Sequence, residues 1–200
     1  MAKTSFEKIE NDNGGCLNIE DSQNITILSA NFKECVATYS GGALQLVDSN
    51  FIKISAANFN KSKAKYFGGA IYFKEKTNNI TIQSTIFDDN AVTADDLFDT
   101  DVRAGGAICI THSPDSSIRM QNVTFMNNRA LAQKSFGGAI YAEDIKTLNI
   151  NFGNSKNELS HANAGAVILV NKAQEVNISN GIFATNQADN TGGAFYFFKI

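Results

Sequence analysis

The chain has 200 residues, 43% of them hydrophobic, with one proline, fifteen glycines and a formal net charge of -3. This length suits one domain with its own core, and the composition argues against collagen, a disordered chain and a helical bundle. The charges are scattered singly, which excludes a basic stripe for nucleic acid. No apolar run approaches the roughly 20 residues of a membrane span, and the first residues hold no signal-peptide pattern.

A glycine phrase recurs from residue 14 to the end of the chain. It reads GGCLNI, GGALQL, GGAIYF, GGAICI, GGAIYA, AGAVIL and GGAFYF, starting at residues 14, 41, 68, 105, 137, 164 and 192. The spacings of 27, 27, 37, 32, 27 and 28 residues give a unit of about 27 residues with two insertions. Each phrase predicts a glycine turn followed by a short strand. The expected core residues are Leu17, Leu44, Ile71, Ile108, Ile140, Val167 and Phe195, with Ile19, Leu46, Phe73, Ile110, Ala142, Leu169 and Phe197 two positions later.

Eleven to thirteen residues into each unit, two apolar residues flank one polar residue. Alternation with period two predicts a second strand with one face buried and the other in water. The apolar pairs are Ile25/Ile27, Ile52/Ile54, Ile80/Ile82, Ile118/Met120, Leu148/Ile150 and Val176/Ile178, and the polar residues between them are Thr26, Lys53, Thr81, Arg119, Asn149 and Asn177.

A Phe-x-x-Asn pattern begins seven residues after the start of that second strand. We expect its asparagines to adopt left-handed corners and to pair through their amides with the backbone or with each other. The pattern is complete at Phe87/Asn90, Phe125/Asn128 and Phe183/Asn186. Units with Phe32 and Phe59 carry Cys35 and Ser62 instead of asparagine, and the unit after Leu148 has Ser155 and Glu158, with Phe152 as a substitute ring.

Three strand patterns per unit, without any helical period, predict an all-β solenoid, a parallel β-helix of roughly seven coils forming one domain over residues 1–200. A propeller blade would need about 40 residues or more. Coils stack at about 4.8 Å, so equivalent residues lie over one another in ladders along the axis.

Together, GGA[ILV] and FxxN resemble the repeat of the chlamydial polymorphic outer-membrane proteins, and similar repeats occur in ciliate surface proteins. The resemblance covers about residues 14–200. It implies a right-handed, single-stranded β-helix that is extracellular or on the cell surface and that adheres or self-assembles without catalysis. The partners would then be proteins, either further copies of the chain or a surface receptor, and no cofactor is expected.

Cys16, Cys35 and Cys109 lie far apart, with no CxxC motif and no paired histidines. This spacing argues against a zinc site. We interpret the three cysteines as small apolar residues at repeat positions, in preference to a disulfide or a reactive thiol.

A second function class is a pectate lyase-like enzyme acting on polysaccharides. Its carboxylates would come from the insertion DDLFDTDVR, in which Asp95, Asp99 and Asp101 are candidate calcium ligands, with Asp96, Arg103 and His112 nearby. A solvated loop outside the repeat is the favoured interpretation, so we expect no enzyme activity.

The outer side of the first strand is apolar, whereas the second strand has a polar outer row. We interpret this apolar row as a candidate interaction stripe, which either contacts a partner or is covered by a corner loop or by further chain. The stripe comprises Ala70, Tyr72, Ala107, Cys109, Ala139, Tyr141, Ala166, Ile168, Ala194 and Tyr196.

Five N-x-[ST] sequons permit N-glycosylation without indicating it. They begin at Asn24, Asn60, Asn79, Asn122 and Asn177.

Overall fold

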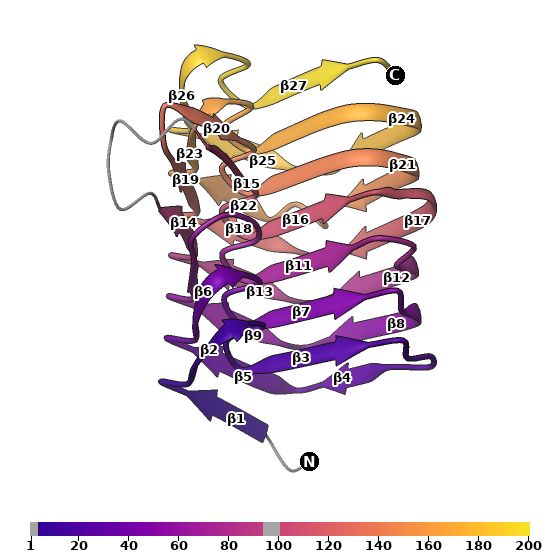
Figure 1. Cartoon of the computed structure of the whole chain (residues 1–200). Helices are drawn as coiled ribbons and strands as arrows, with labels where there is room; N and C mark the ends of the chain where they lie inside the picture. The colour runs from indigo at the N-terminus through magenta and orange to yellow at the C-terminus, as the bar shows by residue number, and fades with distance from the viewer. Residues whose placement is uncertain (1–3, 94–100) are drawn as a thin grey trace.

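The computed structural model describes residues 4–93 and 101–200, and these residues form strands and turns without a helix. The chain climbs as a solenoid with about seven turns, one for each strand of a seven-stranded sheet (Figure 1). Strands of successive turns pair in parallel. In Figure 1 the near strands β7 and β11 point right and the far strands β8 and β12 point left as the chain rises, which is the sense of a right-handed coil.

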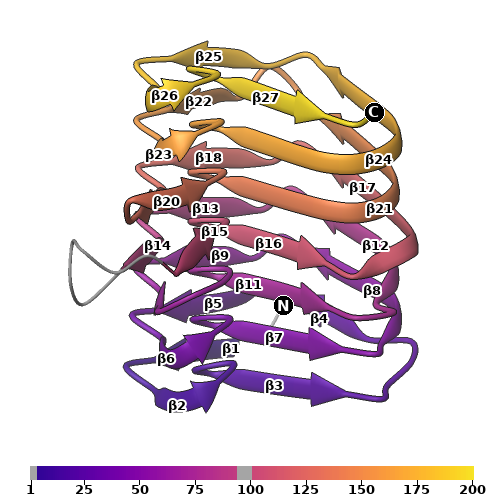
Figure 2. The ribbon, with the colours of Figure 1, turned by 45° about the horizontal axis from the view of Figure 1, so that its top comes forward.

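Each turn contributes strands to three sheets (Figure 2). The largest has eleven strands and wraps a corner, because β21 and β24 run through that corner. Its strands are β3 (Leu17–Glu20), β4 (Thr26–Leu28), β7 (Leu44–Val47), β8 (Asn50–Ser55), β11 (Ile71–Lys74), β12 (Asn78–Gln83), β16 (Ile108–Thr111), β17 (Ser113–Gln121), β21 (Ile140–Asn151), β24 (Ile168–Ser179) and β27 (Phe195–Phe198).

The other two sheets close the coil. The seven-stranded sheet carries the phenylalanines of the Phe-x-x-Asn pattern in every strand but β22. Its strands are β1 (Thr4–Glu7), β5 (Ala30–Lys33), β9 (Asn58–Asn60), β13 (Ile86–Asp88), β18 (Thr124–Met126), β22 (Lys156–Glu158) and β25 (Ile182–Ala184). The nine-stranded sheet leads into the glycine turns through β2 (Glu10–Asn13), β6 (Val36–Ser40), β10 (Lys63–Ala64), β14 (Ala91–Thr93), β15 (Val102–Ala104), β19 (Arg129–Leu131), β20 (Lys134–Phe136), β23 (His161–Ala164) and β26 (Gln187–Thr191).

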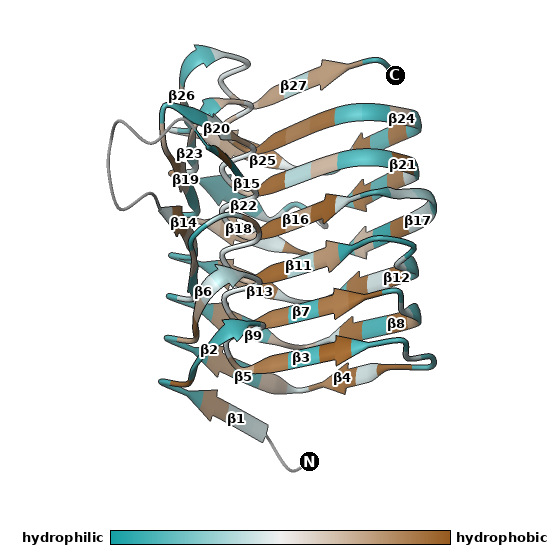
Figure 3. Cartoon of the chain, viewed as in Figure 1, coloured by the Kyte–Doolittle hydropathy of each residue, from teal (hydrophilic) through white to brown (hydrophobic). Residues whose placement is uncertain are grey.

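The core consists of ladders of like residues, as the repeat predicted. Ile80 of β12 pairs with Ile52 of β8 and Ile118 of β17, and all three are buried. Hydrophobic residues are concentrated along β7, β11 and β16, and hydrophilic ones at the bends of β21 and β24 (Figure 3). Burying these apolar stacks supplies the main drive for folding, at about 25 cal/mol per Å² removed from water.

A phenylalanine ladder runs through the seven-stranded sheet. Rings of successive turns stack with centroids 4.7–5.0 Å apart, from Phe6 to Phe125. Phe152 fills the next place, as predicted, with its ring edge-on to Phe125 and Phe183.

The alignment predicted for the turn after Leu148 was wrong by two residues. Asn157 pairs with Phe183, and the backbone N–H of Ser160 bonds to Asn186, so these two residues replace Ser155 and Glu158 in the pattern. The cause is the left-handed turn at Gly153 and Asn154, which adds residues before β22.

The asparagine corners pair through their amides, as expected. Asn128 accepts hydrogen bonds from the backbone and side-chain amides of Asn90, at 3.2 and 3.1 Å, and donates to the Phe87 carbonyl at 2.9 Å. The left-handed residue, however, is the one before the asparagine: Asp89 and Asn127 have φ of 54° and 55°. The asparagine therefore bridges two turns while its neighbour makes the bend.

The glycine turn sets the register of each unit. The first glycine always has a left-handed φ, from 56° at Gly14 to 67° at Gly192, and in the sixth unit Gly165, not Ala164, has this conformation. The predicted register there was wrong by one residue. As a result Ile168 pairs with Ile140 and Leu169 with Tyr141, so Ile168 and Val170 hold the inward positions expected for Val167 and Leu169.

Cys16 and Cys35 form a disulfide, with 5.6 Å between their Cα atoms. The interpretation of both as apolar fillers was therefore wrong, whereas Cys109 is a free, buried thiol. The backbones next to the two cysteines lie close together at this corner, because a Cβ on Gly15 would lie 2.3 Å from the carbonyl oxygen of Val36. Residues 19 apart in sequence thereby meet inside one coil.

Candidate functional site: a polar groove on the second strands

The alanines of the predicted stripe face the core. Ala70, Ala107 and Ala139 belong to the main hydrophobic cluster and are fully buried, and the same holds for the predicted stripe residue Ile168. Ala166 is also fully buried, but it stands at the second-glycine position of its unit. Alternation along the strand does not extend back through the glycine turn, so the residue after the second glycine points inward. The prediction that these alanines form an outer shelf was wrong.

The outward residues of the first strands are covered by the chain itself. Tyr72, Cys109, Tyr141 and Leu169 form a second buried cluster with Ala104 and Ala164, and Phe67 and Phe136 pack against it. The glycine turn folds the preceding residue over the strand, which brings the Phe67 ring within 5.5 Å of the Tyr72 ring. Of the two alternatives for the outer row, contact with a partner or cover by the chain, these residues show cover by a corner of the chain.

The last turn differs, because Ala194 is half-buried and Tyr196 is 37% exposed. Burial raises the pKa of the Cys109 thiol and of the Tyr72 and Tyr141 hydroxyls well above their usual values. The Cys109 thiol is fully buried, and the two tyrosines are almost entirely buried. Within the described residues, Tyr196 is the one exposed member of the stripe, and a binding role of the stripe stays a prediction.

Three of the four aspartates in the acidic insertion, Asp95, Asp96 and Asp99, lie outside the described residues, so the calcium site stays a prediction. Arg103, expected in the same solvated loop, is instead fully buried, with its guanidinium 4.2 Å from the centre of the Tyr66 ring. A cation over an aromatic face explains how this charge is accommodated under the corner.

Four of the five sequon asparagines are exposed, namely Asn24, Asn79, Asn122 and Asn177. Asn60 is half-buried and donates a hydrogen bond to Asp88 at 3.2 Å. The geometry thus leaves glycosylation permitted at four sites, and modification stays a prediction.

The outer face of the second strands carries an open groove of about 560 Å³, which we call the second-strand groove. It runs across β8, β12, β17 and the second half of β21. Its outward-facing lining residues are Phe51, Lys53, Asn79, Thr81, Gln83, Ser117, Arg119, Thr147 and Asn149. Sequence reasoning recognised this row as polar but gave it no role.

Strand pairing fixes the grid of side chains in the groove. Lys53, Thr81 and Arg119 occupy one column on neighbouring strands, so the two cations lie two strand spacings apart, about 9.6 Å between backbones. Hydrogen bonds between turns order the amides, with Gln83 donating to Gln121 at 3.0 Å and Asn79 to Asn50 at 2.9 Å. The groove is therefore preformed.

The charge of the groove is unbalanced. Its lining, taken from the described residues, contains Lys53 and Arg119 but no aspartate or glutamate, and neither cation has an ion-pair partner in the described part of the chain. Both side chains are exposed. In a chain of net charge -3, this groove is a local positive site.

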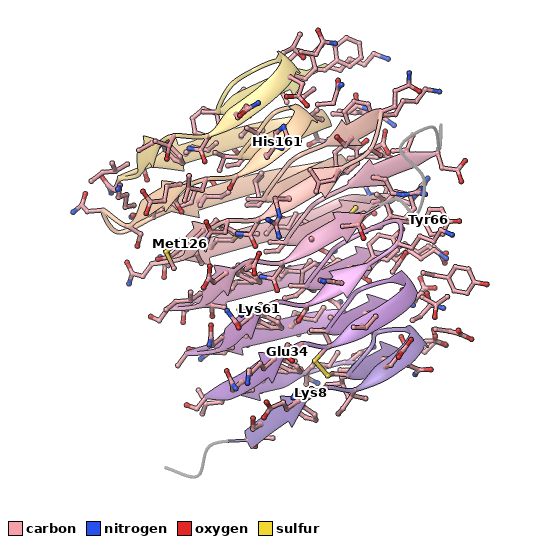
Figure 4. All side chains as sticks on the ribbon, turned by 90° about the vertical axis from the view of Figure 1, so that its left-hand side faces the viewer. Lys8, Glu34, Lys61, Tyr66, Met126 and His161 are labelled. Atoms are coloured by element: carbon pink, nitrogen blue, oxygen red, sulfur yellow. A yellow bond between two sulfur atoms is a disulfide. The ribbon has the colours of Figure 1, made fainter. Side chains whose placement is uncertain are left out.

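A second groove, of about 450 Å³, is lined by charges of both signs. Its corner residues Lys8, Glu34 and Lys61 lie one above another and alternate in sign (Figure 4), and Asp89 pairs with Arg129 at 2.7 Å. Its lining holds Lys8, Lys61, Lys63 and Arg129 together with Glu34 and Asp89, so acids lie among its cations, whereas the described lining of the second-strand groove has none.

Phe51 is the unusual residue of the second-strand groove. It has φ of 55°, a conformation that the equivalent corners fill with Asn24 and Asn79, and it is 54% exposed. A left-handed residue that is neither glycine nor asparagine costs about 1–2 kcal/mol. The sequence signal that could have marked this corner is a phenylalanine at the position where equivalent corners hold Asn24 and Asn79.

Comparison with known proteins identifies one repeat. Residues 122–143, which contain Phe125, Asn128 and the phrase at Gly137, match the Chlamydia polymorphic membrane protein repeat. No curated protein and no solved structure matches the chain. Across the described residues, no helix is long and apolar enough to cross a membrane.

Proposed function

We propose that this chain is a non-enzymatic binding scaffold exposed at the cell surface, and that it adheres through the second-strand groove. The observation that carries the proposal is the preformed polar groove with two unpaired cations and an exposed ring. The ladders beneath it hold these side chains on a rigid support, which lowers the entropic cost of binding.

Two further features support an extracellular location. Polymorphic membrane protein repeats belong to surface proteins, and one such repeat is present at residues 122–143. The Cys16–Cys35 disulfide is of a kind that persists in oxidising compartments.

Adhesion is tested with beads coated with the chain and applied to cultured cells. The variant carries Lys53→Gln and Arg119→Gln, and the control carries Lys76→Gln and Lys134→Gln, which removes the same charge from exposed lysines outside the groove. The proposal expects the wild-type and control beads to adhere and the groove variant to detach. Equal adhesion of all three, or none by the wild type, would reject it.

Self-assembly is a second candidate, favoured by the last turn. Tyr196, Phe197, Phe198 and Ile200 are 37–57% exposed, and β27 pairs on one side only. A further turn of the same solenoid, in this chain or in another copy, would cover these side chains. Light scattering over a range of concentrations tests it: growth that Phe197→Lys and Phe198→Lys abolish supports assembly, and a concentration-independent monomer rejects it.

A further inference from the structure

The geometry points to an acidic glycan, a sugar chain bearing carboxylates or sulfates, as the ligand of the second-strand groove. This inference rests on the adhesive function proposed above and names the chemistry of its ligand. Charge complementarity is the first argument, because the described lining holds Lys53 and Arg119 without a compensating acid.

The spacing of the groove suits a polymer with a short repeat. The Lys53–Thr81–Arg119 column offers one side chain per strand, and a pyranose in an extended glycan advances by about one strand spacing, about 4.8 Å. Anionic groups on alternate sugars would then reach Lys53 and Arg119, while the intervening sugar lies over Thr81. Arginine and lysine both bind carboxylate and sulfate oxygens through charge-assisted hydrogen bonds.

The remaining lining is also suited to sugars. Asn79, Gln83, Ser117 and Asn149 present amides and hydroxyls, which donate to and accept from hydroxyl groups. Phe51, held outward at the groove edge, offers a flat apolar face on which a sugar ring can stack. An aromatic ring beside fixed polar groups combines apolar contact with directional bonding.

A peptide is a poorer match for this face. Extended peptides are usually captured by adding a strand to a free sheet edge, but β12 is paired on both sides, with β8 and β17. The groove is shallow and has one exposed apolar side chain among its lining residues, so it lacks the pockets that anchor peptide side chains. An acidic protein is therefore the alternative that the experiment must reject.

Binding is measured by isothermal titration or surface capture with three probes: polygalacturonate oligosaccharides, which carry carboxylates, dextran sulfate, which carries sulfates, and neutral dextran. We expect at least one charged probe to bind, more weakly as salt rises, and neutral dextran not to bind. Lys53→Gln with Arg119→Gln should weaken binding at least about tenfold, whereas Lys76→Gln with Lys134→Gln should retain it.

Phe51→Asn separates a binding role from a structural one. Asparagine fills the equivalent corner at Asn24 and Asn79, so the variant should unfold no more readily than the wild type. Binding should nevertheless weaken about twofold to tenfold through loss of the aromatic face. Unchanged affinity together with unchanged stability would remove Phe51 from the site.

The outcomes distinguish the ligand from the function. Adhesion to cells without binding to either charged glycan, or with competition by polyglutamate alone, overturns the glycan inference and leaves adhesion standing. Glycan binding that falls equally in the groove variant and in the control shows non-specific charge attraction and also overturns the inference. Sulfate-only or carboxylate-only binding supports it and identifies the anionic group.

Discussion

Replacing Asn128, which lies at a buried corner, with alanine should lower the free energy of unfolding of the solenoid. The fully buried Asn128 side chain accepts two hydrogen bonds from Asn90 and donates one to the Phe87 carbonyl. The Asn90 side chain keeps its bond to the Phe59 carbonyl at 3.0 Å, but its backbone N–H loses a partner. Lost bonds and an unsatisfied buried donor together cost about 2–4 kcal/mol. In a protein of this size the melting temperature should fall by about 4–16 °C.

The assay is thermal and denaturant unfolding followed by circular dichroism, with Asn186→Ala as the matched control. Asn186 makes the same two kinds of bond, to the Ser160 N–H and the Asn157 carbonyl, but is only half-buried. Water can replace its bonds, so its loss should be clearly smaller. An Asn128→Ala variant with the midpoint of the wild type, or equal losses at the two positions, would refute the reasoning.

Other predictions follow from the same turns. Gly106→Ala should unfold the protein or reduce its yield sharply, since the new Cβ would lie 2.1 Å from a carbonyl oxygen of the next turn, whereas Gly193→Ala, with open space around it, should retain the midpoint of the wild type. Cys109, whose pKa is raised by burial, should not react with iodoacetamide at about pH 8 until denaturant is added, and labelling of the native chain would contradict this. Reduction, or Cys16→Ser with Cys35→Ser, should lower stability by about 3 kcal/mol in unfolding assays, and an unchanged midpoint would contradict a stabilising crosslink.

The ladders could be predicted because stacking imposes one residue type at one place in each turn. The apolar pairs around Thr81 and Arg119 align as the pattern indicated, and Phe152 takes the missing phenylalanine's place. The mispredicted registers lie at turns. The sixth glycine phrase was aligned from Ala164, but the residue with the left-handed φ that begins each phrase is Gly165.

Burial of the stripe could not be predicted from alternation. A strand's period assigns Tyr72 and Tyr141 to the outer side, but it does not show that Phe67 and Phe136 fold back over them through the glycine turn. The groove was missed because a polar outer row is ordinary in a half-buried strand and does not by itself indicate a binding site. The sequence does hold Phe51 where equivalent corners hold asparagine, but the arrangement of Lys53 and Arg119 in one column without an acid in the described lining depends on strand pairing that only the coil provides.

The central claim, that the second-strand face is the binding surface, is tested most directly by NMR. The ¹⁵N-labelled chain is titrated with polygalacturonate oligosaccharides or dextran sulfate, with the backbone amides of β8, β12 and β17 and the Arg119 side chain as reporters. We expect shifts concentrated on these strands and little change in β5, β9 and β13 of the seven-stranded sheet. Shifts confined to that sheet or to the exposed residues of β27 would contradict it.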